Sequence, residues 1–225
     1  MIMSAMRFRD RTEAGRRLAE ALARYRDARP IVLALPRGGV PVAFEVARAL
    51  AAPLDVLLVR KIGAPGYPEL GIGAVIDGKD PRVVLNDSVM REVAPAPGYV
   101  EAETERQLVE IERRRRLYRG GRPSPSVAGR TVILVDDGIA TGGTVTAALQ
   151  GLAAAQPARL VLAVPVAPPD VLQTLSQLAD DVVCLSAPHF FGAVGRFYED
   201  FSQTTDEEVI RLLAEAAAPP AAPAA

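Results

Sequence analysis

Two residue types that carry much of protein chemistry are almost missing from this sequence. Its 225 residues include one cysteine, Cys184, and one histidine, His189. A single cysteine excludes an internal disulfide framework and a multi-cysteine zinc site. A single histidine argues against a Ser-His-Asp triad and against a histidine-rich metal cluster. We therefore predict no metal-ligating side chains.

Long apolar segments are absent as well. No apolar run reaches the ~18 residues that a membrane-spanning helix needs. The opening MIMSAMRFRDR has no apolar stretch long enough for a secretory signal. We expect a cytoplasmic protein without a membrane partner.

Excess charge of one sign is the third absence. Lysine and arginine total 26, aspartate and glutamate total 27, and the net charge is −1. This balance lacks the basic footprint of a nucleic-acid binder, so we expect no nucleic-acid partner. Only Lys61 and Lys79 are lysines. Because arginine is the common basic residue here, a lysine is slightly stronger evidence of a functional role than an arginine.

What is present is an alternation of apolar strands and helices. Strands are predicted at 31–35, 55–59, 73–78, 82–87, 131–135, 159–167 and 182–188, and helices at 10–25, 41–52, 144–155, after Pro169 and from Thr205 to about Ala217. Capping pairs at Asp10 with Glu13 and Thr205 with Glu208 support the first and last helices. This pattern predicts an α/β fold with a mainly parallel, twisted sheet flanked by helices.

A charged segment at about 88–125 interrupts this alternation of strands and helices. Within it, 99–119 is predicted to be helical, with salt-bridging spacings such as Glu112 with Arg116. The run Arg113 to Arg116 could form a phosphate or nucleic-acid patch, but the interleaved acids favour a solvated helix that covers the core or contacts a subunit. We expect one domain over 1–217 and a disordered tail at 218–225.

The segment 131–149 carries the most specific chemistry. A buried strand delivers Asp136 and Asp137 to its carboxyl end, where ligands bind in parallel sheets. A Gly-rich loop and a helix N-terminus follow, and together they can hold a phosphate. Paired carboxylates suit vicinal sugar hydroxyls, so the pattern predicts a ribose 5-phosphate site. A Walker A loop is excluded because its lysine is missing, and no GxGxxG pattern opens the first helix.

The 13 residues VILVDDGIATGGT, from Val132 to Thr144, resemble the phosphoribosyl pyrophosphate (PRPP) signature of type I phosphoribosyltransferases. The order of elements over 31–185 is similar as well. The resemblance implies that Asp136 and Asp137 hold the ribose 2- and 3-hydroxyls. It also implies that the 5-phosphate is held by Ala140, Thr141, Gly142, Gly143 and Thr144.

Two further elements agree with the resemblance. Pro36-Arg37-Gly38-Gly39 is similar to the pyrophosphate loop of the family, which often has a cis peptide at the position of Pro36-Arg37. Arg60 and Lys61, at the end of the second predicted strand, resemble a basic pair directed at the pyrophosphate. The alternative for this pair is a solvated strand end.

The segment 65–71 is predicted to be a mobile loop, and the resemblance implies that it closes over the reaction centre and excludes water. The sequence departs from the hypoxanthine and guanine enzymes at Ala140, where they carry an aspartate that handles a base proton. Glu69 is the candidate replacement, and an uninvolved surface glutamate is an equal alternative. The predicted catalytic residues are Glu69, Lys61 and Asp137.

The acceptor is less well specified by the sequence. Residues 187–201 hold five of the eleven aromatic residues, and the resemblance places them in a small C-terminal hood, about 187–217, together with the N-terminal helix. Phe190, Phe191 or Tyr198 could stack on a nucleobase, but packing of the hood on the core is the favoured role for most of them. We regard His189 as structural.

The resemblance implies transfer of ribose 5-phosphate from PRPP to a nitrogen nucleophile, a nucleobase, in nucleotide salvage. Mg²⁺ would be bound mainly through PRPP, and we expect a homodimer. Two alternatives stay open: a regulatory protein that binds PRPP or a nucleotide without turnover, and a synthase-like or hydrolytic activity on a related sugar phosphate.

Overall fold

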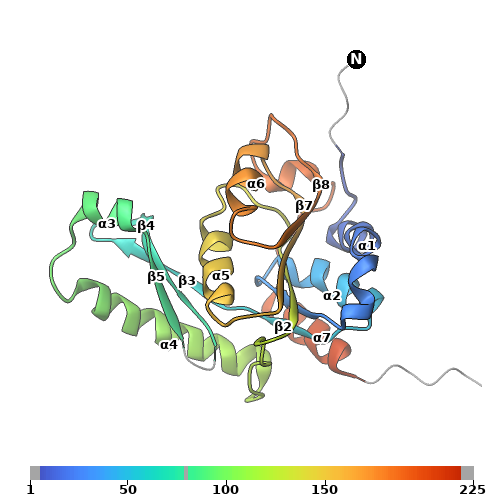
Figure 1. Ribbon diagram of the computed structural model, residues 1–225, viewed down its shortest axis with the longest axis horizontal. Coiled ribbons are helices and arrows are strands. Elements are labelled where there is room, and N and C mark those ends of the chain that lie inside the picture. The colour runs from blue at the N-terminus through green and yellow to red at the C-terminus, as the bar shows by residue number, and fades with distance from the viewer. Residues whose placement is uncertain (1–5, 79–80, 219–225) are drawn as a thin grey trace, which may run out of the picture.

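The computed structural model describes residues 6–78 and 81–218. Five strands form a parallel sheet in the order β2-β1-β6-β7-β8 (Figure 1). The predicted α/β fold with a mainly parallel sheet is confirmed. The strands are β1 (Ile31–Ala34), β2 (Leu54–Val56), β6 (Thr131–Val135), β7 (Arg159–Val166) and β8 (Asp181–Ser186).

Helices cover both faces of this sheet, which is why its strands are continuously apolar. Alternate residues of one strand face opposite ways: Val32 and Ile133 belong to one hydrophobic cluster, and Leu33 and Leu134 to another. The first cluster includes side chains of α1 (Arg11–Ala21), α2 (Gly39–Leu50) and α7 (Asp206–Ala217), and the second includes side chains of α5 (Gly143–Ala153) and α6 (Pro169–Leu175).

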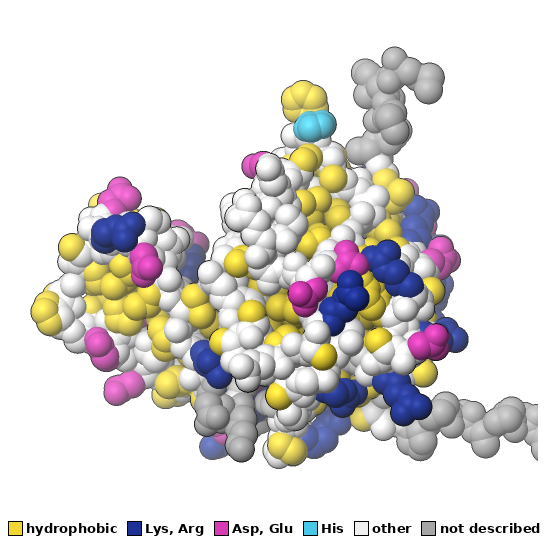
Figure 2. All heavy atoms as spheres, viewed as in Figure 1, with side chains coloured by type: hydrophobic (Ala, Val, Ile, Leu, Met, Phe, Trp, Pro, Cys, Tyr) yellow, Lys and Arg dark blue, Asp and Glu magenta, His cyan; other side chains and the backbone are white. Residues whose placement is uncertain are grey.

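A second sheet forms an arm that projects from the parallel sheet (Figure 1). Its antiparallel order is β3-β4-β5. Hydrophobic side chains gather on this arm in Figure 2, and β5 exposes Val83 and Leu85. The arm consists of β3 (Val59–Ala64), β4 (Tyr67–Ile76), β5 (Arg82–Leu85), α3 (Asp87–Val93) and α4 (Tyr99–Arg119).

The predicted helix 99–119 is confirmed as α4. Its predicted pair, Glu112 with Arg116, is formed with an N–O distance of 2.9 Å. Ile111 and Tyr118 are buried, and α4 contacts β3 and α7. The charged helix therefore covers the core, as the solvated-surface interpretation expected.

Two local predictions were wrong. The predicted strand 55–59 is divided, because β2 ends at Val56 and the chain then leaves the parallel sheet to begin β3 at Val59. The predicted loop 65–71 is instead a hairpin, with a turn at Pro65 and Gly66 and β4 starting at Tyr67. Proline is tolerated in this part of β4 because β5 pairs only with its other end, from Gly73 to Ile76.

The N-terminal segment and the region after β8 pack together. Phe8 forms a parallel bridge with Tyr198, and both side chains are buried. The two predicted caps are present: the side chain of Asp10 accepts a hydrogen bond from the Glu13 amide, and Thr205 accepts one from the Glu208 amide. Residues 219–225 of the predicted tail lie outside the described residues.

The remaining short elements are two 3₁₀ helices, η1 (Ala23–Ala28) and η2 (Val194–Phe197). Within 6–78 and 81–218, no helix combines the length and the apolar character needed to cross a bilayer.

Candidate functional site

The two adjacent carboxylates lie where β6 ends, as predicted. Val135 is the last residue of the strand, and the Asp137 amide donates a 2.9 Å hydrogen bond to Oδ1 of Asp136. Burial and the neighbouring charge of Asp137 raise the pKa of Asp136 well above its ordinary value. Hydroxyl donors or a cation placed here would stabilise the ionised form of the pair.

Arg11 completes this pair, although no pattern in the sequence marks it as a site residue. Its Nε lies 2.8 Å from Oδ2 of Asp137, and both side chains are largely buried. Burial raises the pKa of Asp137, and the Arg11 charge opposes that rise. Arg11 also donates a 2.7 Å hydrogen bond to the Ser202 carbonyl and lies 4.0 Å above the Phe201 ring. No local motif could have linked two residues that are 126 positions apart.

Tyr198 holds the backbone of the same aspartate. Its hydroxyl donates a 2.6 Å hydrogen bond to the Asp137 carbonyl. Burial and the charge of Asp137 raise the pKa of this hydroxyl, so it stays a donor at neutral pH. The region after β8 therefore anchors the acid pair, whereas the sequence suggested nucleobase stacking as one role for Tyr198.

The turn at Pro36–Gly39 packs directly against the acid pair. The Leu35 amide donates a 2.9 Å hydrogen bond to the Val135 carbonyl, so the ends of β1 and β6 are adjacent. The peptide between Pro36 and Arg37 is cis, as the family resemblance implied.

Both glycines of this turn are required by close approach. A Cβ on Gly38 would overlap the carboxylate of Asp137, and one on Gly39 would lie 3.0 Å from the Asp136 Cα. The turn and the acid pair therefore form one surface.

The loop after the acid pair is open to solvent. Ala140, Thr141, Gly143 and Thr144 are exposed, and a Cβ added to Gly143 would meet no atom within 4 Å. Gly142 has φ 78°, which favours glycine. The first amides of α5 have no partner within the helix and can bind an anion in this space.

The predicted basic residues take different positions. Arg60 lines a small cavity of about 30 Å³ together with Pro36 and Thr144, and its Nε donates a 3.0 Å hydrogen bond to Gln107. Arg60 is therefore close to both loops, although it lies within β3 and not after a parallel strand. Arg37 lies 3.8 Å from Asp206 at the start of α7.

Lys61 and Glu69 pair with each other on the arm. The Lys61 Nζ lies 3.0 Å from a Glu69 carboxylate oxygen and 2.9 Å from its carbonyl oxygen. The Glu69 side chain is 97% exposed. Among the described residues, no hydrogen bond or ion pair joins either side chain to the loop 136–144.

The aromatic residues after β8 divide into two groups. Phe191, Phe197 and Tyr198 are buried in one cluster, which supports the packing role. Phe190 is 97% exposed and Phe201 is 36% exposed, so these two rings are accessible to a ligand. Burial raises the pKa of the Cys184 thiol, in agreement with an unreactive cysteine.

Asp136 and Asp137 are the side chains of this site that suit a metal ion. Across 6–78 and 81–218, no three His, Cys, Asp or Glu residues cluster with the geometry of a metal site. Asp136 and Asp137 carry the hard oxygen donors that Mg²⁺ prefers, and Arg11 balances only one of their charges. The pair can therefore accept a cation that a substrate supplies with most of its other ligands.

Comparison with known proteins agrees with this geometry. Residues 8–202 match the family model described as the phosphoribosyl transferase domain. Two proteins from Mycobacterium tuberculosis strains H37Rv and CDC 1551, provisionally named phosphoribosyl transferases, are 48% identical over 206 residues. This match covers 92% of the chain and 46% of each relative, so the chain spans about half the length of these relatives.

A solved structure covers nearly the whole fold. The crystal structure of TT1426 from Thermus thermophilus is 49% identical and superposes with a TM-score of 0.83. The match covers 95% of this chain and 100% of the other.

Proposed function

This chain belongs to the phosphoribosyl transferase domain family, and we propose that it transfers ribose 5-phosphate from PRPP to a nitrogen nucleophile. One observation carries the proposal: the acid pair at the end of β6 is in contact with the Pro36–Gly39 turn and leads into an open loop at the start of α5. Acceptors for hydroxyls and donors for anions therefore share one edge of the sheet.

Each part of this edge suits one part of PRPP. Asp136 and Asp137 would accept hydrogen bonds from the ribose 2- and 3-hydroxyls. The amides of Ala140–Thr144, with the hydroxyls of Thr141 and Thr144, would hold the 5-phosphate. The Pro36–Gly39 turn and Arg60 would contact the pyrophosphate.

The chemistry follows from this placement. The bond from ribose C1 to the pyrophosphate oxygen breaks, a bond from C1 to the acceptor nitrogen forms, and that nitrogen loses a proton. Asp136 and Asp137 would be the protein's contacts to a Mg²⁺ ion held mainly by PRPP, and such an ion would supply charge neutralisation for the leaving pyrophosphate. The protein's contribution is then mainly positioning and charge stabilisation.

The arm would supply the remaining groups. We assign Glu69 as the residue that takes the acceptor proton and Lys61 as a second contact to pyrophosphate. Their mutual ion pair would have to open for this, and the β3–β4 hairpin would have to move toward the acid pair. An exposed carboxylate next to a lysine is available for such a change of partner.

The acceptor that we propose is a nucleobase, which implies a role in nucleotide salvage. The exposed ring of Phe190 supports this choice because it can stack on a planar base. Ala140 offers no carboxylate near the loop, so an acid–base group must come from elsewhere, such as Glu69.

Binding of PRPP can be tested without knowing the acceptor. The double variant Asp136→Asn and Asp137→Asn should weaken PRPP binding at least ~10-fold in calorimetry with Mg²⁺, because charge-assisted hydrogen bonds are lost. Asp27→Asn, at an exposed position, is the matched control and should bind as the parent does. Unchanged affinity in a folded double variant would refute the proposed site.

Catalysis needs a separate assay. A panel of nucleobases with PRPP and Mg²⁺, followed by pyrophosphate release, should identify at least one acceptor. If PRPP binds and depends on the acid pair, but no acceptor releases pyrophosphate, the chain is a regulatory or binding protein and not a transferase.

A further inference from the structure

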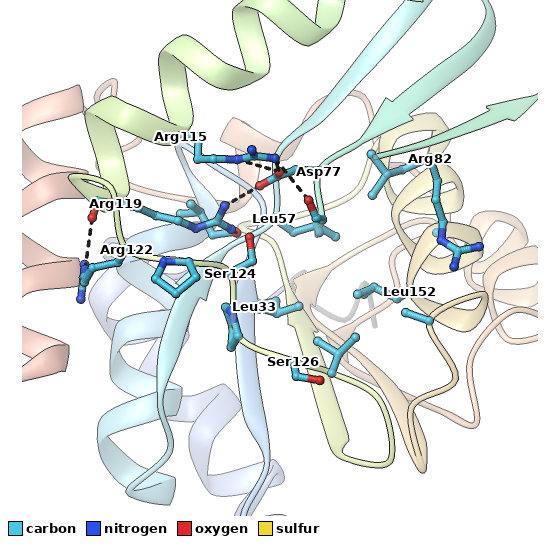
Figure 3. A pocket seen from close by; sticks show the side chains of 18 of the residues that line it. Leu33, Leu57, Asp77, Arg82, Arg115, Arg119, Arg122, Ser124, Ser126 and Leu152 are labelled. Atoms are coloured by element: carbon cyan, nitrogen blue, oxygen red, sulfur yellow. Dashed lines mark hydrogen bonds and ion pairs between the residues drawn. The ribbon is translucent and has the colours of Figure 1, made fainter. Parts of the chain in front are cut away.

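A large cavity lies apart from the acid pair, between α4, the segment 120–128 and the C-terminal end of α5 (Figure 3). Its volume is about 640 Å³, within the range of small-molecule sites. Gly151 and Leu152 line it, whereas the candidate phosphate loop ends at Thr144, in the first turn of α5. Gly151 follows Thr144 by seven residues of α5, which separates the two places by roughly 10 Å at 1.5 Å per residue.

The charged lining of this cavity is mostly basic. Glu112 and Asp77 are its acidic members. The basic members are Arg82, Arg115, Arg116, Arg119 and Arg122. An anion would therefore enter a region where positive charge exceeds negative charge.

Two of these arginines are committed to structure. The Arg119 guanidinium lies 2.6 Å from Asp77 and 2.9 Å from Asp55, and it is almost fully buried. Arg115 forms an ion pair with the same Asp77 (Figure 3). Because the charges of Arg115 and Arg119 are already paired with aspartates, these two residues stabilise the structure around the cavity and can balance little of a ligand's negative charge.

The other arginines remain available. Arg116 is 78% exposed and pairs with Glu112 at 2.9 Å. Within the described part of the chain, Arg82 and Arg122 form no ion pair, and the Nε of Arg122 donates a 3.2 Å hydrogen bond to the Arg119 carbonyl. Two exposed arginines thus line the cavity without a described carboxylate partner, and they lie on opposite sides of the view in Figure 3.

The rest of the lining is apolar or hydroxylic. Ser124 and Ser126 add hydroxyl donors to the lining. The apolar members of the lining are Leu33, Val56, Leu57, Ile76, Val127 and Leu152. A lining that combines guanidinium and hydroxyl donors with apolar side chains matches a ligand with an anionic head and an apolar body.

We propose that this cavity is a second binding site, specific for an organic phosphomonoester whose body is planar or apolar. A phosphate dianion has several oxygens, and each of them can accept a hydrogen bond from a guanidinium or hydroxyl group of the lining. Inorganic phosphate has no apolar body, so it would leave the apolar side chains of the lining in contact with water. The site is independent of the proposed transferase reaction and does not share its acid pair.

The test uses three matched probes and calorimetry on the intact protein: 1-naphthyl phosphate, 1-naphthol and inorganic phosphate. The naphthyl phosphate should bind at least ~10-fold more tightly than either fragment, because it contacts both the donors and the apolar side chains of the lining. PRPP should not displace it. Absence of binding, or complete competition by PRPP, would overturn the proposal.

Two variants locate the binding. Arg122→Glu reverses an exposed charge in the lining, and Ser126→Trp fills the space from an exposed position, so neither should prevent folding. Each should weaken naphthyl phosphate binding at least ~10-fold and leave PRPP affinity unchanged. Unchanged naphthyl phosphate affinity in both variants would refute the site.

Arg130→Glu is the matched control for the charge reversal. Arg130 is also exposed, also donates to a backbone carbonyl and lies outside the lining. The Arg130→Glu variant should bind naphthyl phosphate as the parent does. A loss of affinity equal to that of Arg122→Glu would mean that the ligand is attracted only by the positive charge of the surface, and this would overturn the proposed site. Adenosine monophosphate distinguishes ligand sources: tighter binding than naphthyl phosphate indicates a nucleotide, and equal or weaker binding indicates another organic phosphate.

Discussion

The Arg11 guanidinium lies 2.8 Å from the Asp137 carboxylate and ties the first helix to the candidate substrate site. One positive charge thus faces two adjacent carboxylates in a largely buried place. The two carboxylates therefore keep an excess of negative charge, which a cation or hydroxyl donors can stabilise. The Arg11 charge lowers the free energy cost of burying these carboxylates in their ionised form.

Replacing Arg11 by methionine should raise the pKa of Asp137, because the Arg11 charge holds that pKa down. Carboxyl ¹³C NMR titration measures the change directly. PRPP affinity at neutral pH should fall roughly 10-fold, since loss of the partner leaves a buried carboxylate unpaired. Arg17→Met, on the same helix and 43% exposed, should change neither quantity.

Gly38→Ala should disturb the acid pair through sterics alone. The added methyl would overlap the Asp137 carboxylate, which must then rotate away from Arg11. We expect a lower melting temperature and at least ~10-fold weaker PRPP binding. Gly143→Ala should leave the melting temperature unchanged because its Cβ meets no atom within 4 Å. Equal melting temperatures for the two variants would contradict this account.

Arg119→Met should destabilise the fold by about 3–5 kcal/mol, because it leaves Asp77 and Asp55 without their shared buried partner. Urea unfolding measures the difference. Arg116→Met removes an arginine that is 78% exposed from the same helix and should cost less than about 1 kcal/mol. Comparable losses for both would mean that burial of the ion pairs is unimportant.

Glu69→Gln should lower kcat by roughly 10²-fold if Glu69 takes the acceptor proton, with PRPP affinity nearly intact. Lys61→Ala should reduce both kcat and PRPP affinity. Steady-state kinetics with the best acceptor from the panel checks both. Full activity of Glu69→Gln would leave Glu69 as a surface residue that only pairs with Lys61, and the proton would then leave by another route.

Tyr198→Phe should reduce stability by about 1–3 kcal/mol, since the buried Asp137 carbonyl loses its hydroxyl donor. PRPP affinity should fall by a smaller factor than in the acid-pair variants, because the carboxylates stay in place. Tyr67→Phe, at a position 73% exposed, is the control and should behave as the parent does.

The local signals in the sequence determined the parallel sheet, most helix boundaries and the acid pair. A run such as TVILV followed by two aspartates and a Gly-rich loop specifies a buried strand, its carboxyl end and a helix start within one short segment. Capping pairs at Asp10 and Thr205 are local too, and the structure contains both. Interactions between residues close together in the sequence are sufficient to specify these features.

Only the tertiary structure decided which distant groups meet. The apolar run 55–59 gave no sign that it divides between two sheets, because strand pairing depends on partners elsewhere in the chain. Glycine and proline in 65–71 indicated a loop, but pairing with β3 made this segment a hairpin. Arg11, Tyr198 and the basic cavity near Arg122 join residues that are far apart in sequence. Their contacts arise from the packing of whole elements, which no local pattern of residues encodes.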